Sequence, residues 1–457
     1  MVDIHDIPPE ILATAFELGI YSEGISFLRP LAKVCRSWRE IIDHTPRLWG
    51  IILIRKRTSS KALERQIAKA KASPLSITIS PGTSVGRYKN PIAQLTKLSS
   101  NWVIADIGTQ FISPCLWVDL HRSLEELSLS RDAPAYDDPG PFFEGVDTLT
   151  KRETKLRSFT ATGLSRSWVL GFLGPSIRHF GLIRGLNNVI EPGNYMAIRN
   201  RCRISDTWDY LARVPEATSI ELKDLRHTHP HSLTPPHVHL LKLRNLKATS
   251  VLHLSSVLAS VAAPSLQTLS VNQNPPNIEQ AWSWNNARRY SLPMAPLFTQ
   301  WSAPGFVPTH LHTLELLNCL EVGDVPYFIR WLERLPNLVR LFVEDEADAF
   351  GRAANNGEAN FYNALASPLT ADDGHTSWLC PSLMILYLIA DHEISDLIAI
   401  ARARGGIIPT AYDIPPPNRL RRLEAHLCAT SEADDVDYIR SVIDNAYCIC
   451  TNCGLNV

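Results

Sequence analysis

The sequence lacks any long apolar run. No stretch approaches the roughly 20 apolar residues of a membrane-spanning helix, and the opening MVDIHDIPPE has neither a basic start nor an apolar core. We therefore expect no transmembrane helix and no signal peptide. An excess of charge of one sign is also missing, since 45 Lys and Arg stand against 46 Asp and Glu. This balance argues against general nucleic-acid binding, which needs a basic surface.

Cysteine and glycine are both infrequent. The cysteines bear on the redox compartment of the protein, and the glycines bear on its turns. Nine scattered cysteines in 457 residues are an odd number, which suits a reducing compartment better than a disulfide scaffold. We therefore expect a cytoplasmic or nuclear protein. The 22 glycines are outnumbered by 32 prolines, a ratio that fits many loops and few glycine turns. With 45% hydrophobic and 20% charged residues, the chain is long enough for two or three globular domains.

Motifs that carry catalysis are absent too. The sequence has no Gly-rich phosphate loop, no nucleophile elbow and no HExxH motif. Nothing in it predicts an enzyme or a cofactor.

Two clusters of metal-ligating residue types remain. Cys448, Cys450 and Cys453 are close enough to hold zinc, but a closed site needs a fourth ligand, and Cys428 is assigned below to a repeat. A reduced, packed tail is the better interpretation. The second cluster consists of histidines on a proline-rich loop and the following strand, with no carboxylate nearby to orient the imidazole rings. We interpret it as a surface loop; its members are His227, His229, His231, His237 and His239.

The first fifty residues carry three short helical patterns. Pro8 and Pro9 suit the first turn of a helix, and its apolar residues Ile11, Leu12, Ala15 and Phe16 fall on one face. A second helix is expected from Pro30, with an apolar stripe at Leu31, Val34, Cys35, Trp38, Ile41 and Ile42. Thr45 and Pro46 predict a third helix that carries Leu48 and Trp49. Such a unit is either a helical cap on a larger fold or a small domain that awaits a partner.

The segments DIPPEILATAF, PLAKVCRSWREI and TPRLW, in this order, resemble an F-box of the fungal, basidiomycete-like type. The resemblance covers about residues 3–52 and departs from the family pattern at Ile7, where leucine is usual, and at Ala15. It implies docking on the Skp adaptor of a cullin-based ubiquitin ligase. By resemblance, the docking surface includes Ile7, Pro8, Pro9, Leu12 and Phe16. A second group is shared between docking and the core of the domain, in proportions that the sequence leaves open: Val34, Cys35, Trp38, Leu48 and Trp49.

Beyond a basic helical segment and a strand at PLSITIS, one pattern recurs: apolar-x-x-apolar-x-apolar. Its ten copies begin at Leu124, Leu156, Ile177, Ala217, Val238, Leu266, Leu311, Leu338, Leu383 and Leu420. The spacing of about 21 to 45 residues is typical of leucine-rich repeats with insertions. Cys319 follows one copy at the Asn/Cys position of such repeats, as Asn274 and Cys428 do, while other copies lack it. We therefore expect an irregular horseshoe.

The expected fold is α+β, in the form of an α/β solenoid: a three-helix F-box followed by an irregular leucine-rich-repeat horseshoe. We assign residues 1–54 to the F-box, 55–73 to a helical linker, 74–430 to the repeat domain with long insertions, and 431–457 to a C-terminal helix and cysteine-containing tail.

Alternation along each repeat strand predicts a binding face. The fourth and sixth positions of the pattern point inward, so the third, fifth and seventh point to the concave face. In the later repeats these outward positions are apolar, with charged neighbours. The candidate substrate-binding residues are Leu317, Arg340, Phe342, Ile385, Tyr387 and Ile389. The alternative is that insertions around 345–381 and 391–418 fold over these strands and bury them.

These expectations combine into a substrate receptor of a Skp–cullin–F-box ubiquitin ligase. The F-box would bind the Skp adaptor and through it cullin, and the repeats would bind a protein substrate whose identity the sequence does not give. Such a receptor acts by tethering and needs no catalytic residues. The alternative is a repeat scaffold that binds a protein without a role in a ligase.

Overall fold

The computed structural model describes most of the chain, and it divides into two compact units, Met1–Asn194 and Tyr195–Val457. We treat each unit by itself. The residues described are 7–80, 88–109, 123–131, 154–183, 202–225, 227–228, 236–251, 253–273, 293–345, 349–355, 360–370, 376–390, 393–406, 414–425 and 433–448.

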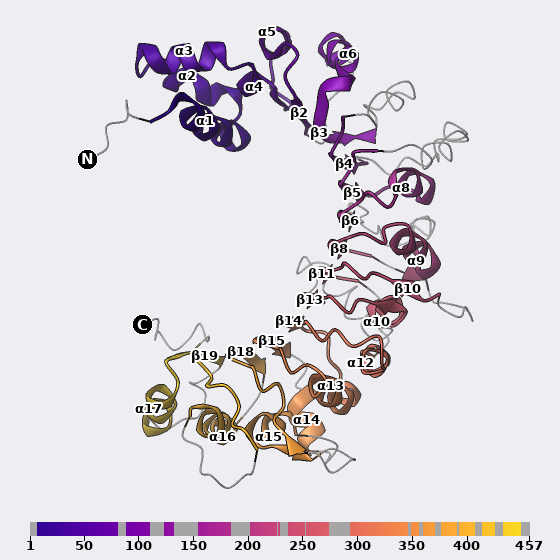
Figure 1. The fold of residues 1–457 in the computed structure, drawn as a ribbon, viewed down its shortest axis with the longest axis vertical. Helices are drawn as coiled ribbons and strands as arrows, with labels where there is room; N and C mark the ends of the chain where they lie inside the picture. Colours follow the sequence, from indigo (N-terminus) through magenta and orange to yellow (C-terminus); the bar gives the residue numbers. More distant parts are fainter. Residues whose placement is uncertain are drawn as a thin grey trace, which may run out of the picture. The chain divides into compact units, whose positions relative to one another are not determined.

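The first unit begins with a cluster of short helices (Figure 1). They are α1 (Pro9–Glu23), the 3-10 turn η2 (Ile25–Phe27), α2 (Leu28–Leu31), α3 (Arg36–His44) and α4 (Pro46–Trp49). As predicted, α1 starts at the proline pair, and its C-cap is Gly24, whose φ of +81° favours glycine. The buried side chains at the centre of the cluster are Leu12, Phe16, Ile20, Leu28, Ile42 and Leu48.

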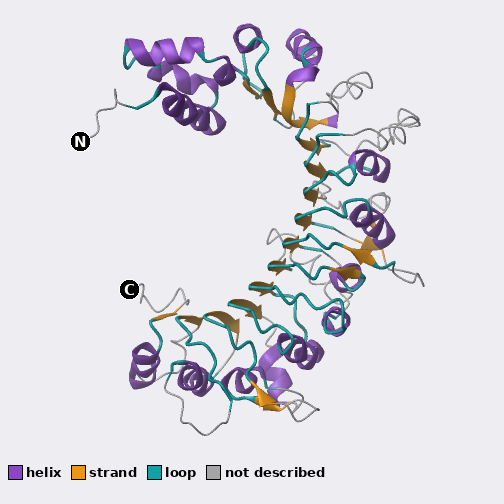
Figure 2. Ribbon diagram, in the orientation of Figure 1, coloured by secondary structure: helices purple, strands orange, loops and turns teal. Residues whose placement is uncertain are grey.

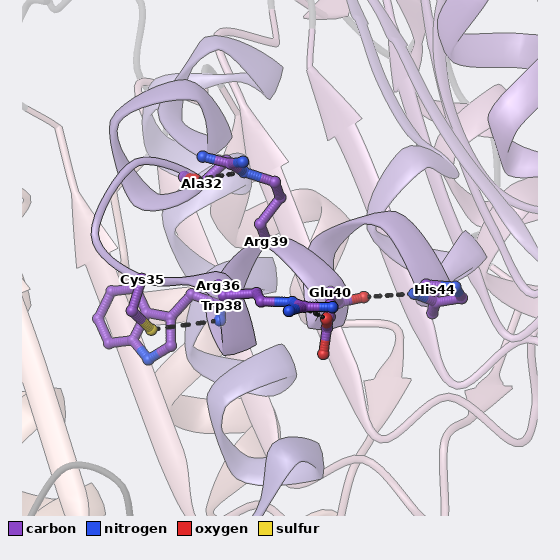
Figure 3. Close-up of polar contacts among 7 residues, drawn as sticks. All are labelled: Ala32, Cys35, Arg36, Trp38, Arg39, Glu40 and His44. Carbon is purple, nitrogen blue, oxygen red and sulfur yellow. Dashed lines mark hydrogen bonds and ion pairs between the residues drawn. The ribbon is translucent and has the colours of Figure 1, made fainter.

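The second helix is not continuous, and this prediction was wrong. Helix α2 ends at Leu31, and Cys35 adopts an extended conformation with φ −155° and ψ 170°. Its thiol accepts a hydrogen bond from the Trp38 N–H at 3.4 Å, so Cys35 caps α3 instead of lying inside a helix (Figure 3). Arg39 spans the break, because its Nε donates to the carbonyl of Ala32 at 3.0 Å. The apolar stripe is thus shared between two helices.

The helical cluster leads directly into a parallel sheet. Residues 51–54, which the sequence assigned to the helical domain, form β1 (Ile51–Ile54), and β1 pairs with β2 (Leu75–Ile79). The segment between them contains α5 (Ser60–Ala70), whose inner face is buried. Gln66 on α5 donates to the carbonyls of Trp49 and Ile51 at 3.2 and 2.7 Å. The expected linker therefore packs as the helix of a β–α–β unit.

The sheet of the first unit continues in sequence order, every neighbouring pair being parallel. Its further strands are β3 (Trp102–Gly108), β4 (Glu126–Ser130), β5 (Ser158–Thr162) and β6 (His179–Ile183). The helical segments between the strands are α6 (Lys89–Lys97), η4 (Ser99–Asn101) and α8 (Arg166–Phe172).

The second unit repeats this arrangement. Its parallel strands, in order, are β8 (Ser219–Lys223), β11 (Asn245–Thr249), β13 (Thr268–Asn272), β14 (Thr313–Leu317), β15 (Arg340–Asp345), β18 (Ile385–Ala390), β19 (Arg422–Ala425) and β20 (Asn445–Cys448). Among the described residues, three short pairs lie outside this sheet: β7 (Cys202–Arg203) with β9 (His227–Thr228), β10 (Val238–His239) with β12 (Val261–Ala262), and β16 (Leu369–Thr370) with β17 (Thr376–Ser377).

The helices of the second unit lie on one side of its strands (Figure 2). They are α9 (Ile204–Ala212), α10 (Leu254–Leu258), α12 (Ala295–Trp301), η9 (Val322–Asp324), α13 (Val325–Leu332), α14 (Ala349–Asn355), α15 (Phe361–Ala366), α16 (Ile394–Arg404) and α17 (Ala433–Val442). Aromatic side chains join several of them. The rings of Phe298 and Trp331 stack at 5.1 Å, and those of Phe350 and Phe361 at 4.4 Å.

Nine of the ten predicted repeat copies coincide with strands of the parallel sheets. The copy at Val238 does not, and its assignment was wrong. Val238 and His239 pair with β12, and the strand of the main sheet is β11, which begins at Asn245, seven residues after Val238, and has Leu246 and Ala248 buried. The segment LRNLKA at Leu243 has the same pattern, so pairing with β8 and β13 decides which copy joins the sheet.

A turn recurs directly after several strands. Gly163, Asp224, Ser250 and Asn318 each have φ between 53° and 68°. All four of these N–H groups donate to the next strand: Gly163 to Ile183 at 2.9 Å, Asp224 to Thr249 at 2.9 Å, Ser250 to Asn272 at 2.7 Å, and Asn318 to Glu344 at 2.7 Å. Glycine, asparagine and aspartate are the residues that tolerate this conformation best. In the repeat that contains Cys319, the residue with positive φ is Asn318. The recurring turn thus lies one residue before the Asn/Cys position that the sequence singled out.

The fold is therefore mixed α/β with long parallel sheets, which is compatible with an α/β solenoid. None of the described helices combines the length and the apolar character needed to cross a membrane.

Candidate functional site

The ten residues predicted to contact an adaptor occupy three environments. Pro8, Pro9 and Val34 are exposed. Leu12, Phe16 and Leu48 have 8%, 3% and 0% of their surface exposed and form the core of the helical cluster. The remaining four are partly buried at its edge: Ile7, Cys35, Trp38 and Trp49.

Helix α1 exposes a second apolar face that the sequence analysis missed. Ile11, Leu18 and Tyr21 are exposed by 60%, 67% and 46%. Ile11 was placed on the same face as Leu12, which was wrong, because the core takes Leu12, Phe16 and Ile20. The spacing of seven and three residues from Ile11 to Leu18 to Tyr21 puts them on one helical stripe. Because α1 is apolar on both sides, periodicity alone does not show which side is covered.

Trp38 and Trp49, the two tryptophans of the helical cluster, are held in place by contacts within the first unit. The Trp38 ring meets Phe16 edge-on at 5.1 Å. The Trp49 indole donates to the carbonyl of Ile42 at 2.9 Å, and the ammonium of Lys69 lies 4.0 Å from the centre of its ring. The two side chains therefore close the edge of the core, and the exposed apolar surface comes from other residues.

The second candidate surface is the outward face of β14, β15 and β18. Alternation is confirmed there: the inward side chains of Leu314, Leu316, Leu341, Val343, Leu386 and Leu388 have no exposed surface. The predicted outward residues Leu317, Phe342, Ile385, Tyr387 and Ile389 are all partly exposed, and Arg340 is exposed.

Strand register brings two of these residues, Phe342 and Tyr387, into one row with Glu315 and Glu424. Glu315 pairs with Phe342, Phe342 with Tyr387, and Tyr387 with Glu424 on β19. The rings of Phe342 and Tyr387 are 5.6 Å apart. An aromatic pair thus lies between two carboxylates.

Charged residues border this row on both sides. Arg422 forms an ion pair with Glu424 and also stacks over the ring of Tyr447 at 5.4 Å. On the other side, the Asn318 amide donates to Oε1 of Glu344 at 2.6 Å. Burial, together with the carboxylates of Glu424 and Glu344, raises the pKa of the Tyr387 phenol. Glu424 and Glu344 therefore both contribute negative potential at the Tyr387 ring.

The alternative, that insertions cover these strands, is not supported by the described residues. The described parts of the two insertions include α14, α15 and α16, which lie on the helical side of the sheet (Figure 2). There Arg404 at the end of α16 is fully buried. It donates to the carbonyls of Leu365 at 2.8 Å and Cys380 at 3.2 Å, and also to that of Leu379.

Neither metal-ligating cluster gains support. Among the described residues, no three His, Cys, Asp or Glu side chains gather in a way that could hold a metal ion. His237 and His239 are exposed, and the ring of His237 packs against Phe306 at 5.7 Å. Cys448 is partly exposed in β20. The other members, His229, His231, Cys428, Cys450 and Cys453, together with Asn274, lie outside the described residues.

Comparison with known proteins gives no match: no protein-family model matches the chain, and no curated protein is significantly similar to it.

Proposed function

We propose that this chain is the substrate receptor of a Skp–cullin–F-box ubiquitin ligase. The helical cluster would be the F-box and would bind the Skp adaptor, and the strands beyond it would be a leucine-rich-repeat domain that binds a protein substrate. The receptor would contribute no catalytic residues. It would raise the effective concentration of the substrate near the ubiquitin-transfer machinery.

One observation carries the first half of this proposal. Seven large apolar side chains are exposed among the described residues, and four of them lie within the first 34 residues: Ile11, Leu18, Tyr21 and Val34. This clustering in so small a helical unit favours a surface that a second protein covers. The proline pair at the start of α1 adds exposed apolar surface.

The geometry of the second unit supports the other half. Its helices lie on one side of the sheet (Figure 2). The opposite face of β14, β15 and β18 presents aromatic and aliphatic side chains with a charged border. Apolar centres with charged rims are typical of protein interfaces. The two candidate surfaces are thus formed by different units of the chain.

The adaptor surface is tested by co-purification of the full chain with a purified Skp adaptor. The variant Ile11→Glu, Val34→Glu changes two side chains that are each 60% exposed, so the helical core is preserved. Removing central apolar contacts and burying charge in their place weakens an interface by more than about 2 kcal/mol, which is at least about 30-fold in affinity.

Leu241→Glu is the matched control, because Leu241 is also 60% exposed but belongs to the second unit. We expect the wild type and the control to retain the adaptor and the double variant to lose it. If the wild-type chain does not bind the adaptor at all, the ligase role is refuted and a protein-binding scaffold remains. Equal binding by the double variant would refute this choice of surface.

A further inference from the structure

Basic side chains are concentrated on α5 and on the residues that flank it. All of them are exposed, and we refer to them as the basic patch: Arg55, Lys56, Arg57, Lys61, Arg65, Lys69 and Lys71. Glu64 is the one acidic residue between Arg55 and Lys71, so this segment has a net charge of +6, whereas the whole chain has −1. A short part of the first unit is therefore strongly positive in a chain that is close to neutral.

The elements around α5 do little to neutralise this charge. Those that pack most closely against it are α4, β1 and α6, and none of the three contains aspartate or glutamate. Asp43 on α3 pairs with Lys69 at 3.0 Å. In the sheet, Asp106 of β3 lies two strands away from β1. The members of the basic patch that form no ion pair with any described residue are Arg55, Arg57, Lys61, Arg65 and Lys71.

Buried contacts hold the basic patch on an ordered frame. The inner face of α5 is buried in the first unit. Tyr88 has no exposed surface and holds the loop before α5. Its hydroxyl lies 3.0, 3.3 and 2.9 Å from the carbonyl oxygens of Arg55, Lys56 and Thr58. Because the loop and the helix are ordered before a ligand binds, less conformational entropy is lost on binding.

The exposed side of α5 offers charge without apolar surface. None of the large exposed hydrophobic side chains of the described residues lies between 55 and 71, and the exposed uncharged residues of α5 are Ala62 and Ala68. A helix that binds a membrane inserts an apolar face, and single-stranded nucleic acid stacks on aromatic side chains. The basic patch provides neither.

Duplex nucleic acid is also disfavoured, because it requires positive charge over a wide surface. Since the whole chain has a net charge of −1 and residues 55–71 have +6, the other residues together have −7. A short anionic ligand that contacts only the basic patch avoids this negative remainder. The charge distribution therefore favours a short acidic segment of a protein.

The spacing of the cations on α5 fits an extended peptide. Lys61 and Arg65 are four residues apart on the helix, which places them about 6 Å apart along its axis. Alternate side chains of an extended peptide point to the same side and are about 6–7 Å apart. An extended segment with a carboxylate at every second position can therefore place one carboxylate beside each cation, and arginine can bind a carboxylate through two parallel hydrogen bonds.

We infer that the basic patch binds an extended acidic segment of a partner protein, in which aspartate or glutamate recurs at alternate positions. The segment lies along the exposed side of α5, with carboxylates beside Lys61 and Arg65, and it extends to the loop that carries Arg57. This inference goes beyond the proposed function and does not depend on it, because the basic patch and the exposed apolar face of α1 consist of different residues.

Fluorescence anisotropy of the full chain with two short labelled peptides tests this inference. One peptide alternates glutamate with serine, and the other carries glutamine in place of glutamate. We expect the glutamate peptide to bind at least about tenfold more tightly at low salt, with a difference that shrinks as salt increases. Equal binding of the two peptides, or no binding of the glutamate peptide, would overturn the inference.

Duplex DNA and phosphatidylserine vesicles are the competing polyanions. Each is added to the complex with the labelled glutamate peptide, at the same salt concentration and the same concentration of negative charge as the unlabelled glutamate peptide. We expect the unlabelled peptide to be the strongest competitor. Stronger displacement by the DNA or by the vesicles would assign the basic patch to that ligand and overturn the inference.

Variants locate the site of binding. Arg57→Gln, Lys61→Gln, Arg65→Gln removes three exposed charges and should weaken the glutamate peptide about tenfold. The matched control removes the same charge from exposed positions of the second unit: Arg213→Gln, Arg330→Gln, Arg334→Gln. We expect the control to bind within about twofold of the wild type. Equal losses in the two variants, or no loss in the first, would refute the site.

Tyr88→Phe tests the contribution of the ordered loop. It removes the hydroxyl beside the three carbonyls and keeps the buried ring, so the charge of the basic patch is unchanged. We expect the glutamate peptide to bind about two- to threefold more weakly, with the salt dependence of the wild type, whereas the triple variant should have a smaller salt dependence. Unchanged affinity in Tyr88→Phe would refute the contribution of the loop.

The adaptor experiment is independent of these measurements. Adaptor binding without selectivity for the glutamate peptide would refute this inference alone. Peptide selectivity without adaptor binding would refute the ligase role alone.

Discussion

Replacement of the buried Arg404 by methionine should destabilise the second unit strongly. Arg404 has no exposed surface, and its guanidinium donates to three backbone carbonyls, those of Leu365, Leu379 and Cys380. These carbonyls belong to the end of α15 and to the segment before β18, so one side chain joins three parts of the chain. Burial lowers the pKa of Arg404 to about 10, which leaves it protonated at neutral pH.

The size of the expected loss in the free energy of unfolding follows from these contacts. Hydrogen bonds from a charged donor contribute about 1.5–3 kcal/mol each, and a carbonyl left unpaired in the interior costs about 1–3 kcal/mol. The desolvation of the guanidinium, several kcal/mol, is recovered in the variant and offsets part of the loss. We therefore expect Arg404→Met to lower the free energy of unfolding by about 3–5 kcal/mol.

Urea unfolding of the full chain, followed by tryptophan fluorescence and circular dichroism, measures this change. Arg402→Met is the matched control: Arg402 lies on the same helix, but it is exposed and only approaches the ring of Tyr438 at 5.8 Å. We expect the control to lose no more than about 1 kcal/mol. A loss of that same size in Arg404→Met would refute the reasoning, because the three carbonyls would then need no charged donor.

Three further predictions concern single residues. Cys35→Ala removes the thiol cap of α3 and should lower stability by about 0.5–1 kcal/mol in thermal unfolding, whereas Cys35→Ser should retain the cap; a loss in both would mean that the thiol acts by packing. Asn318→Val places a β-branched residue at φ 53° and should cost about 1–3 kcal/mol, while Asn318→Gly should cost less, and the reverse order in urea unfolding would contradict a conformational cause. Burial raises the pKa of the Cys380 thiol from 9.0 to about 12, although the Arg404 guanidinium opposes this. The folded chain therefore retains the thiol proton above pH 9, where the unfolded chain releases it, and stability should fall by up to about 1 kcal/mol between pH 9 and 10. Cys380→Ala should lack this fall, and identical pH profiles in urea unfolding would refute the assignment.

The sequence by itself determined the periodic parts of this protein. The proline pair fixed the start of α1, and the apolar-x-x-apolar-x-apolar pattern fixed most of the strands, because alternation along a strand sets which side chains face the core. The outward positions of Phe342 and Tyr387 followed from the same alternation. These features depend on local spacing, which a sequence displays directly.

Tertiary structure alone decided which of several equivalent patterns was used. Helix α1 is apolar on both sides, and only packing shows that Leu12 is covered and Ile11 is not. Likewise, two segments near Val238 share the repeat pattern, and pairing with neighbouring strands selects the second. The row of Phe342 and Tyr387 between Glu315 and Glu424 arises only when the four strands align in register. Register and burial are contacts between distant residues, and spacing along the chain does not specify them.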